Sequence, residues 1–131
     1  MLTCVANGVI PGLAIAKAVG ARWVRANQWV NAYVANEGIL NGPAPAAMRY
    51  RARIGATDVR IFADVHVKFG AHAITADRSI TEQATDAEWF DADVLIATGT
   101  RTGSPTEPRE VEEVAAGTAL PVIVGSGLAP G

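Results

Sequence analysis

The sequence has a single cysteine, no marked excess of charge and no long apolar run. Cys4 alone among 131 residues excludes a disulfide framework and a zinc site built on cysteines. The formal net charge is −2 and no basic patch is present, so nucleic acid is not an expected partner. No apolar run approaches the ~20 residues of a transmembrane segment, and Met1–Val5 lacks the basic leader of a signal peptide. We therefore expect a cytoplasmic protein.

What is present is an alternation of strand and helix patterns. Five apolar runs predict strands, at residues 2–5, 21–27, 58–68, 93–98 and 121–124. Helical patterns separate them, at residues 11–19, 46–54, 79–89 and 105–116, with proline or glycine at most of their ends. Residues 28–42 show no clear period and are expected to form a long loop. Alternating strands and helices are typical of right-handed parallel βαβ units, so the expected fold class is α/β.

Two of these helices carry more specific predictions. Ser79 and Glu82 have the spacing of a capping box, which predicts a helix start at that serine. Trp89 and Phe90, at the end of the same helix, are expected to pack it against the sheet. The last helix is expected to direct its glutamates toward solvent, at Glu107, Glu110, Glu112 and Glu113.

The arrangement of elements predicts part of a larger (β/α)8 barrel. No element precedes the first strand, and Leu128–Gly131 ends the sequence where a helix should begin. Five parallel strands with two open edges expose backbone groups that normally pair. We therefore expect residues 1–131 to be poorly soluble, marginally stable or oligomeric, either as a homo-oligomer or with a complementary chain that covers the open edges.

The strand predicted at residues 58–68 carries a row of ionisable side chains. With a period of two, one face is apolar and the other presents Asp64, His66 and Lys68 at intervals of ~6–7 Å. Such a row is typical of the C-terminal end of a barrel strand at a catalytic site, and the alternative is a half-exposed strand. His66 is suited to general acid–base catalysis. Lys68 is a candidate Schiff-base nucleophile, or a partner of Asp64 or of a substrate phosphate.

Residues that follow the neighbouring strands are further candidates. Arg25 and Asn27 end the strand before the row and should lie beside it as ligand-binding residues. A metal site on Asp64, His66 and Asn27 is the less favoured alternative, and we predict no metal and no cofactor.

Two glycine-containing loops are candidate ligand-binding segments. The loop after residues 93–98 offers Thr100, Thr102 and Gly103, and its alternative role is that of a flexible polar loop. Gly125, Ser126 and Gly127 directly follow the last strand, where glycines let backbone N–H groups approach a phosphate. Late strands of α/β barrels often bind phosphate in this way.

These motifs, in this order, resemble the BtpA/SgcQ family. The resemblance includes Ala63–Lys68, covers essentially the whole sequence and is specific at Asp64–Lys68. Its other segments are residues 13–22, 24–27, 32–34, 37–39, 49–51, 76–80, 102–103 and 124–127. The sequence departs from the family pattern at two places. Phe69 stands where the family usually has histidine, and His72 lies three residues further on. Asn7-Gly8 stands where the family has Asn-Asp.

The resemblance implies a fold similar to the ribulose-phosphate-binding (β/α)8 barrels. Residues 1–131 would then be strands three to seven of one barrel domain, without the first two βα units, the last helix and the last strand. One implied function is binding of a small phosphorylated ligand, with isomerase, aldolase or lyase chemistry at Asp64, His66 and Lys68. The other is that of a non-catalytic photosystem I biogenesis or stability factor, which acts through protein partners and associates peripherally with a membrane.

Overall fold

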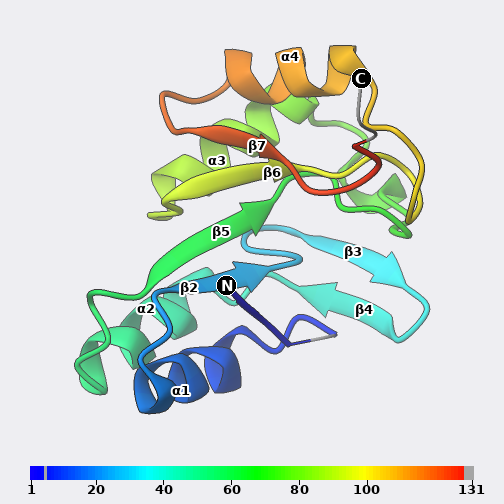
Figure 1. The fold of residues 1–131 in the computed structure, drawn as a ribbon. Coiled ribbons are helices and arrows are strands. Elements are labelled where there is room, and N and C mark those ends of the chain that lie inside the picture. Colours follow the sequence, from blue (N-terminus) through cyan, green and yellow to red (C-terminus); the bar gives the residue numbers. More distant parts are fainter. Residues whose placement is uncertain (5, 129–131) are drawn as a thin grey trace.

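The computed structural model describes residues 1–4 and 6–128 (Figure 1). Val5, the last residue of the predicted first strand, and residues 129–131 at the chain end lie outside the described residues. Five strands form a parallel sheet in the order β1-β2-β5-β6-β7. Their bounds are β1 Leu2–Thr3, β2 Trp23–Ala26, β5 Arg60–Asp64, β6 Val94–Ala97 and β7 Val122–Val124. The helices are α1 Val9–Val19, α2 Ala44–Arg53, α3 Ile80–Trp89 and α4 Pro108–Ala116. The predicted α/β class is confirmed.

The strand order is that of a sheet wound in one direction. Each strand of the sheet lies beside the next one along the chain, without the reversal of order that defines a doubly wound fold. Helices α1 to α4 all contribute to one core cluster with Val24, Ile61 and Leu95, and the pairing register places these three on one face. The arrangement is compatible with part of a (β/α)8 barrel, although within residues 1–4 and 6–128 the sheet does not close.

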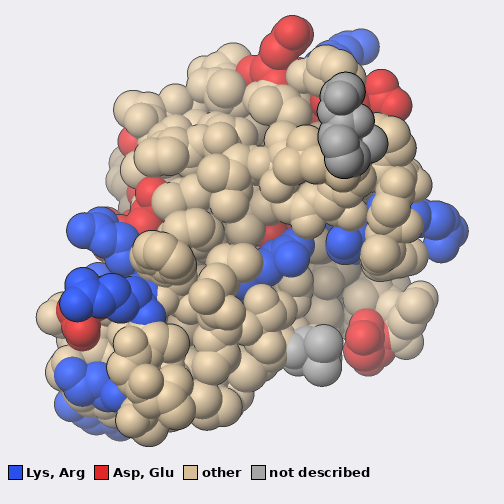
Figure 2. Space-filling model, viewed as in Figure 1, with Lys and Arg blue, Asp and Glu red and all other residues tan. Residues whose placement is uncertain are grey.

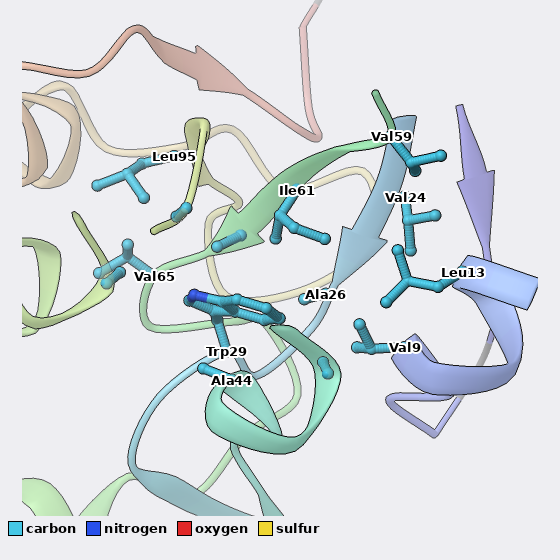
Figure 3. Packing of buried hydrophobic residues seen from close by; sticks show 14 of the residues in the cluster. Val9, Leu13, Val24, Ala26, Trp29, Ala44, Val59, Ile61, Val65 and Leu95 are labelled. Atoms are coloured by element: carbon cyan, nitrogen blue, oxygen red, sulfur yellow. The ribbon is translucent and has the colours of Figure 1, made fainter. Parts of the chain in front are cut away.

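Trp29 occupies the centre of the core. Its ring is 1% exposed and lies among Ala26, Ile61 and Ala44, between the sheet and α2 (Figure 3). Its indole Nε1 donates a hydrogen bond to the Phe90 carbonyl at 2.9 Å, so the polar edge of the ring is satisfied. The segment after β2 is thereby anchored beneath the carboxyl ends of the strands.

The segment expected to be a long loop is an antiparallel hairpin, so that prediction was wrong. Strands β3 (Ala32–Ala35) and β4 (Gly38–Asn41) pair around a turn at residues 36–37, and Gly38 adopts a φ of 107°. The backbone of Val34 exchanges two hydrogen bonds with Ala71, in the segment that follows β5. The strands have only four residues each and are flanked by Asn and Gly, which hid their pattern among turn residues.

Strand β5 is shorter than its sequence pattern predicts. It ends at Asp64, and His66 then takes a left-handed backbone conformation with a φ of 55°. The amide of Lys68 donates to Thr98 Oγ1 at 3.0 Å, which draws the chain toward the end of β6. The prediction that Asp64, His66 and Lys68 share one strand face was therefore wrong.

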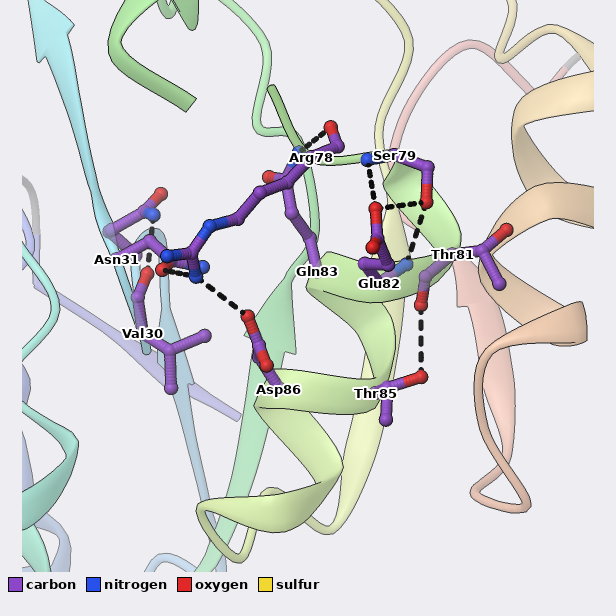
Figure 4. Close-up of polar contacts among 10 residues, drawn as sticks. Val30, Asn31, Arg78, Ser79, Thr81, Glu82, Gln83, Thr85 and Asp86 are labelled. Atoms are coloured by element: carbon purple, nitrogen blue, oxygen red, sulfur yellow. Dashed lines mark hydrogen bonds and ion pairs between the residues drawn. The ribbon is translucent and has the colours of Figure 1, made fainter. Parts of the chain in front are cut away.

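Helix α3 begins as predicted and ends differently. Ser79 Oγ accepts from the Glu82 amide at 3.1 Å and Glu82 Oε2 accepts from the Ser79 amide at 2.7 Å, which confirms the capping box (Figure 4). Trp89 is 81% exposed, so its predicted packing against the sheet was wrong. The buried face of α3 runs through Ala84 and Ala87, and two further residues turn the helix by about 200°, away from the core.

Arg78, just before α3, connects this helix to the hairpin. Its Nη1 atom donates to Asn31 Oδ1 at 3.0 Å and to Asp86 Oδ2 at 3.2 Å (Figure 4). Asn31 directly precedes β3, so the contact joins the start of the hairpin to the outer surface of α3.

Candidate functional site

An ion pair joins the carboxyl ends of β2 and β5. Arg25 Nε and Nη2 donate to the two Asp64 carboxylate oxygens at 2.9 Å each, and Asn27 Nδ2 donates to Oδ2 at 3.3 Å. The expected position of Arg25 and Asn27 beside Asp64 is thus confirmed. Burial raises the pKa of the Asp64 carboxyl, while the hydrogen bonds from Arg25 and Asn27 act in the opposite direction. Asp64 binds Arg25 rather than Lys68, which removes one of the three roles considered for that lysine.

An open pocket of about 530 Å³ lies beyond this ion pair, at the carboxyl ends of β5 and β6. Its charged and titratable side chains are His66, Lys68, His72, Arg101 and Glu110. Lysine and arginine atoms lie in the middle of the face shown in Figure 2, beside a recess. A second hollow of about 260 Å³ is lined by Asn27 and Tyr33, and Lys68 lines both this hollow and the pocket. The short strand and the turn at His66 therefore still bring two of the three predicted catalytic side chains to one cavity.

Two cationic groups of the pocket lack acidic partners within residues 1–4 and 6–128. Among the described residues, neither the Lys68 ammonium nor the Arg101 guanidinium takes part in an ion pair or side-chain hydrogen bond. Arg101 lies over the Phe69 ring, with its guanidinium carbon 5.6 Å from the ring centroid. The pocket can therefore accept an anion without first breaking a salt bridge.

Two pocket side chains, His66 and His72, form a stack of three rings with Tyr33, which borders the second hollow. The centroids of His66 and His72 are 4.0 Å apart, and those of His72 and Tyr33 are 5.5 Å apart. His72 Nε2 donates to the Val67 carbonyl at 2.9 Å, which holds its ring in place. A side chain at Gly70 would not fit, because its Cβ would lie 2.6 Å from both the Tyr33 and His72 rings. The stack fixes the ring of His66 against the pocket.

The protonation of His66 suits a base. Burial lowers the pKa of its imidazole, the nearby His72 lowers it further, and Glu113 acts in the opposite direction. A neutral imidazole near neutral pH has one nitrogen free to accept a proton. This is the state that a general base requires.

Glu110 is a pocket residue that the sequence pattern misassigned. It was expected on the solvent side of α4, yet it lines the pocket and its Oε1 atom is buried. Burial raises the pKa of its carboxyl, Glu113 and Glu107 add to the rise, and the Thr98 backbone amide opposes it. As the third residue of α4, Glu110 lies within reach of the strand ends. The sequence did not distinguish it from the other glutamates of this helix, which were all expected to face solvent.

The two predicted glycine loops lie against each other. Thr100 borders the pocket, whereas Thr102, Gly103 and residues 125–127 are not among its lining residues. The Gly103 amide donates to Ser126 Oγ at 3.4 Å, and the Gly125 amide donates to the Ala97 carbonyl at 2.8 Å. Gly127 has a φ of 71° and leaves no room for a Cβ beside the Ser104 carbonyl, so a glycine is needed for this contact.

Within the described part of the chain, no three His, Cys, Asp or Glu side chains gather as a metal site. No described helix combines the length and apolar character needed to cross a bilayer.

The fold and site define an α/β protein with a singly wound parallel sheet and a cationic pocket at the carboxyl ends of its strands. The chain belongs to the BtpA family, whose family model matches residues 2–130. It is 37% identical over 125 residues to the photosystem I biogenesis protein BtpA of Synechocystis, a match that covers 92% of this chain and 42% of that protein.

Two other relatives are uncharacterized proteins. The chain is 40% identical over 116 residues to a mitochondrial protein of Caenorhabditis elegans, covering 88% of this chain and 42% of that protein. It is 38% identical over 122 residues to a protein of Archaeoglobus fulgidus, covering 93% and 48%. The chain thus spans less than half the length of these relatives. No solved structure matches it significantly.

Proposed function

We propose that the pocket at the ends of β5 and β6 binds a small phosphorylated ligand of the sugar-phosphate type. The observation that carries the proposal is the pair of cationic groups, Lys68 and Arg101, that line one cavity and have no acidic partner among the described residues. Phosphate oxygens are the partners such groups bind best. Binding at the carboxyl ends of parallel strands is also usual for this class of fold.

The proposed chemistry is of the isomerase, aldolase or lyase type. His66 would move a proton as general acid or base, and Lys68 would contact the phosphate or form a Schiff base with a carbonyl. Asp64 would position Arg25 at the floor of the site. Additional phosphate contacts are proposed at Gly125, Ser126 and Gly127, and further ligand contacts at Asn27, Thr100, Thr102 and Gly103.

The proposal includes a barrel larger than residues 1–131. Strands β1 and β7 each have one unpaired edge within the described residues, and the sheet's strand order is compatible with a segment of a (β/α)8 barrel. The matched segments cover only 42–48% of the length of these relatives. We propose that these residues are about strands three to seven, and that further polypeptide, a second copy or a complementary chain pairs with the two edges.

Titration with ribose 5-phosphate tests the ligand proposal. Lys68→Ala should weaken binding at least tenfold, because it removes one of two cationic partners of the phosphate. Lys17→Ala is the matched control, since Lys17 is the only other lysine, its ammonium donates to the Gly55 carbonyl, and its side chain lines neither hollow of the site. Equal affinity of both variants, or no binding to the unmodified protein, would refute the proposal.

A second function is favoured by the name of the Synechocystis relative, a photosystem I biogenesis protein. A non-catalytic biogenesis factor would act through protein partners, and the hairpin offers the exposed apolar side chains of Val34 and Ile39 for such contacts. Cells that carry His66→Ala and Lys68→Ala would then keep the normal phenotype. Loss of that phenotype in either variant would favour the ligand-binding function.

A further inference from the structure

Glu110 places a carboxyl group in a pocket whose other charged groups are cationic. It lies in the first turn of α4 and lines the same cavity as Lys68 and Arg101. Its Oε1 atom is buried and has no hydrogen-bond partner among the described residues. None of the four ion pairs of the described chain includes it. The carboxyl group is therefore present at the site without a protein partner for one of its oxygens.

Such an oxygen calls for an explanation, because buried polar atoms are nearly always hydrogen-bonded. One other side-chain atom in the described residues shares the condition, Arg51 Nε. That guanidinium is still well bonded, because its Nη2 atom donates to the Thr57 carbonyl and its Nη1 atom to the Met48 sulfur. Glu110 differs from Arg51 in that its side chain also lines a cavity large enough to hold a small molecule, so its carboxyl group can accept a hydrogen bond from a ligand.

We infer that Glu110 accepts a hydrogen bond from a hydroxyl group of the ligand. The inference rests on the proposed function, since it assigns a second part of the same ligand. Lys68 and Arg101 bind the phosphate, and Glu110 binds a hydroxyl carried by the same molecule. The pocket thereby selects phosphorylated sugars or polyols over phosphates that lack hydroxyls.

The selection has two physical causes. A ligand hydroxyl donates to the Glu110 carboxyl group, and hydrogen bonds to a charged acceptor are stronger than those between neutral groups. A phosphate without hydroxyls makes no such bond and adds its negative charge to a cavity that already holds a carboxylate. Glu110 is therefore a specificity-determining residue, and Lys68 and Arg101 supply the general affinity for phosphate.

Calorimetric titration of the protein with two probes, ribose 5-phosphate and methyl phosphate, tests this assignment. Glu110→Ala should weaken ribose 5-phosphate by about tenfold to a hundredfold and leave methyl phosphate unchanged or bound more tightly. Glu112→Ala is the matched control, because it removes the same charge from the exposed side of α4 and should change neither affinity. If Glu110→Ala does not fold, Glu110→Gln replaces it, with a smaller loss expected for ribose 5-phosphate alone.

The outcomes separate this inference from the proposed function. Equal weakening of both probes by Glu110→Ala, or no change in either, overturns the role of Glu110 while phosphate binding stands. Failure of both probes to bind the unmodified protein overturns the proposed function and this inference with it.

Discussion

Removal of Arg25 should be one of the most destabilising single changes in this protein. The Asp64 side chain is 0% exposed, and its two oxygens accept both guanidinium hydrogen bonds at 2.9 Å. Arg25→Ala would leave a buried carboxylate with only the weaker Asn27 contact at 3.3 Å. Loss of one partner of a buried pair costs about 3–5 kcal/mol, which for a chain of this size lowers the melting temperature on the order of 10–20 °C.

Urea unfolding followed by circular dichroism at pH 7 measures the effect. Arg60→Ala is the control, because the Arg60–Asp93 pair has the same chemistry with an arginine that is 65% exposed, and its loss should cost at most about 1 kcal/mol. The double variant Arg25→Met with Asp64→Leu should lie within about 1 kcal/mol of the unmodified protein or above it, because no charge is left buried. A loss below about 1 kcal/mol for Arg25→Ala would refute the description of Asp64 as a buried, arginine-bound carboxylate.

Three further predictions follow from local geometry. Ser79→Ala should lower the free energy of unfolding by about 1 kcal/mol in urea melts, whereas Ser79→Asp, which keeps an acceptor at the helix start, should cost much less; equal losses would contradict the capping role. The lowered pKa of His66 means that its stabilising contribution is present above its ordinary value of 6.5 and is lost as pH falls through the folded-state pKa. Below pH 6.5, the free energy of unfolding should therefore fall more steeply with pH in the unmodified protein than in His66→Asn, because asparagine tolerates the left-handed backbone at this position. If Lys68 forms a Schiff base, borohydride reduction in the presence of ribulose 5-phosphate should attach the sugar phosphate to Lys68 and not to Lys17. Mass spectrometry of the peptides measures this, and an adduct at Lys17 alone, or no adduct, would contradict a Schiff base at Lys68.

Much of the fold follows from local patterns in the sequence. The five parallel strands and four helices have apolar runs, prolines and glycines at the spacing their geometry requires, and Ser79 with Glu82 identifies a helix start to the residue. The place of Arg25 and Asn27 beside Asp64 follows from the rule that neighbouring strands in such a fold are parallel and adjacent.

The parts that the patterns missed depend on tertiary contacts. The alternating pattern of Asp64, His66 and Lys68 continues in the sequence past residue 64, where β5 ends. The pattern does not reveal the left-handed turn at His66 that takes the chain out of the strand. The hairpin of β3 and β4 is supported by backbone bonds between Val34 and Ala71, which no local rule predicts. Glu110 has the same sequence environment as its exposed neighbours, and only the packing of α4 beside the end of β6 turns it inward.

A crystal structure of the protein with ribose 5-phosphate would show where a phosphorylated sugar binds. The phosphate should lie within hydrogen-bonding distance of Lys68 or Arg101, with a sugar hydroxyl on the Glu110 carboxylate. A ligand bound away from this pocket, or seated there with its phosphate away from both cationic groups, would contradict the proposed site.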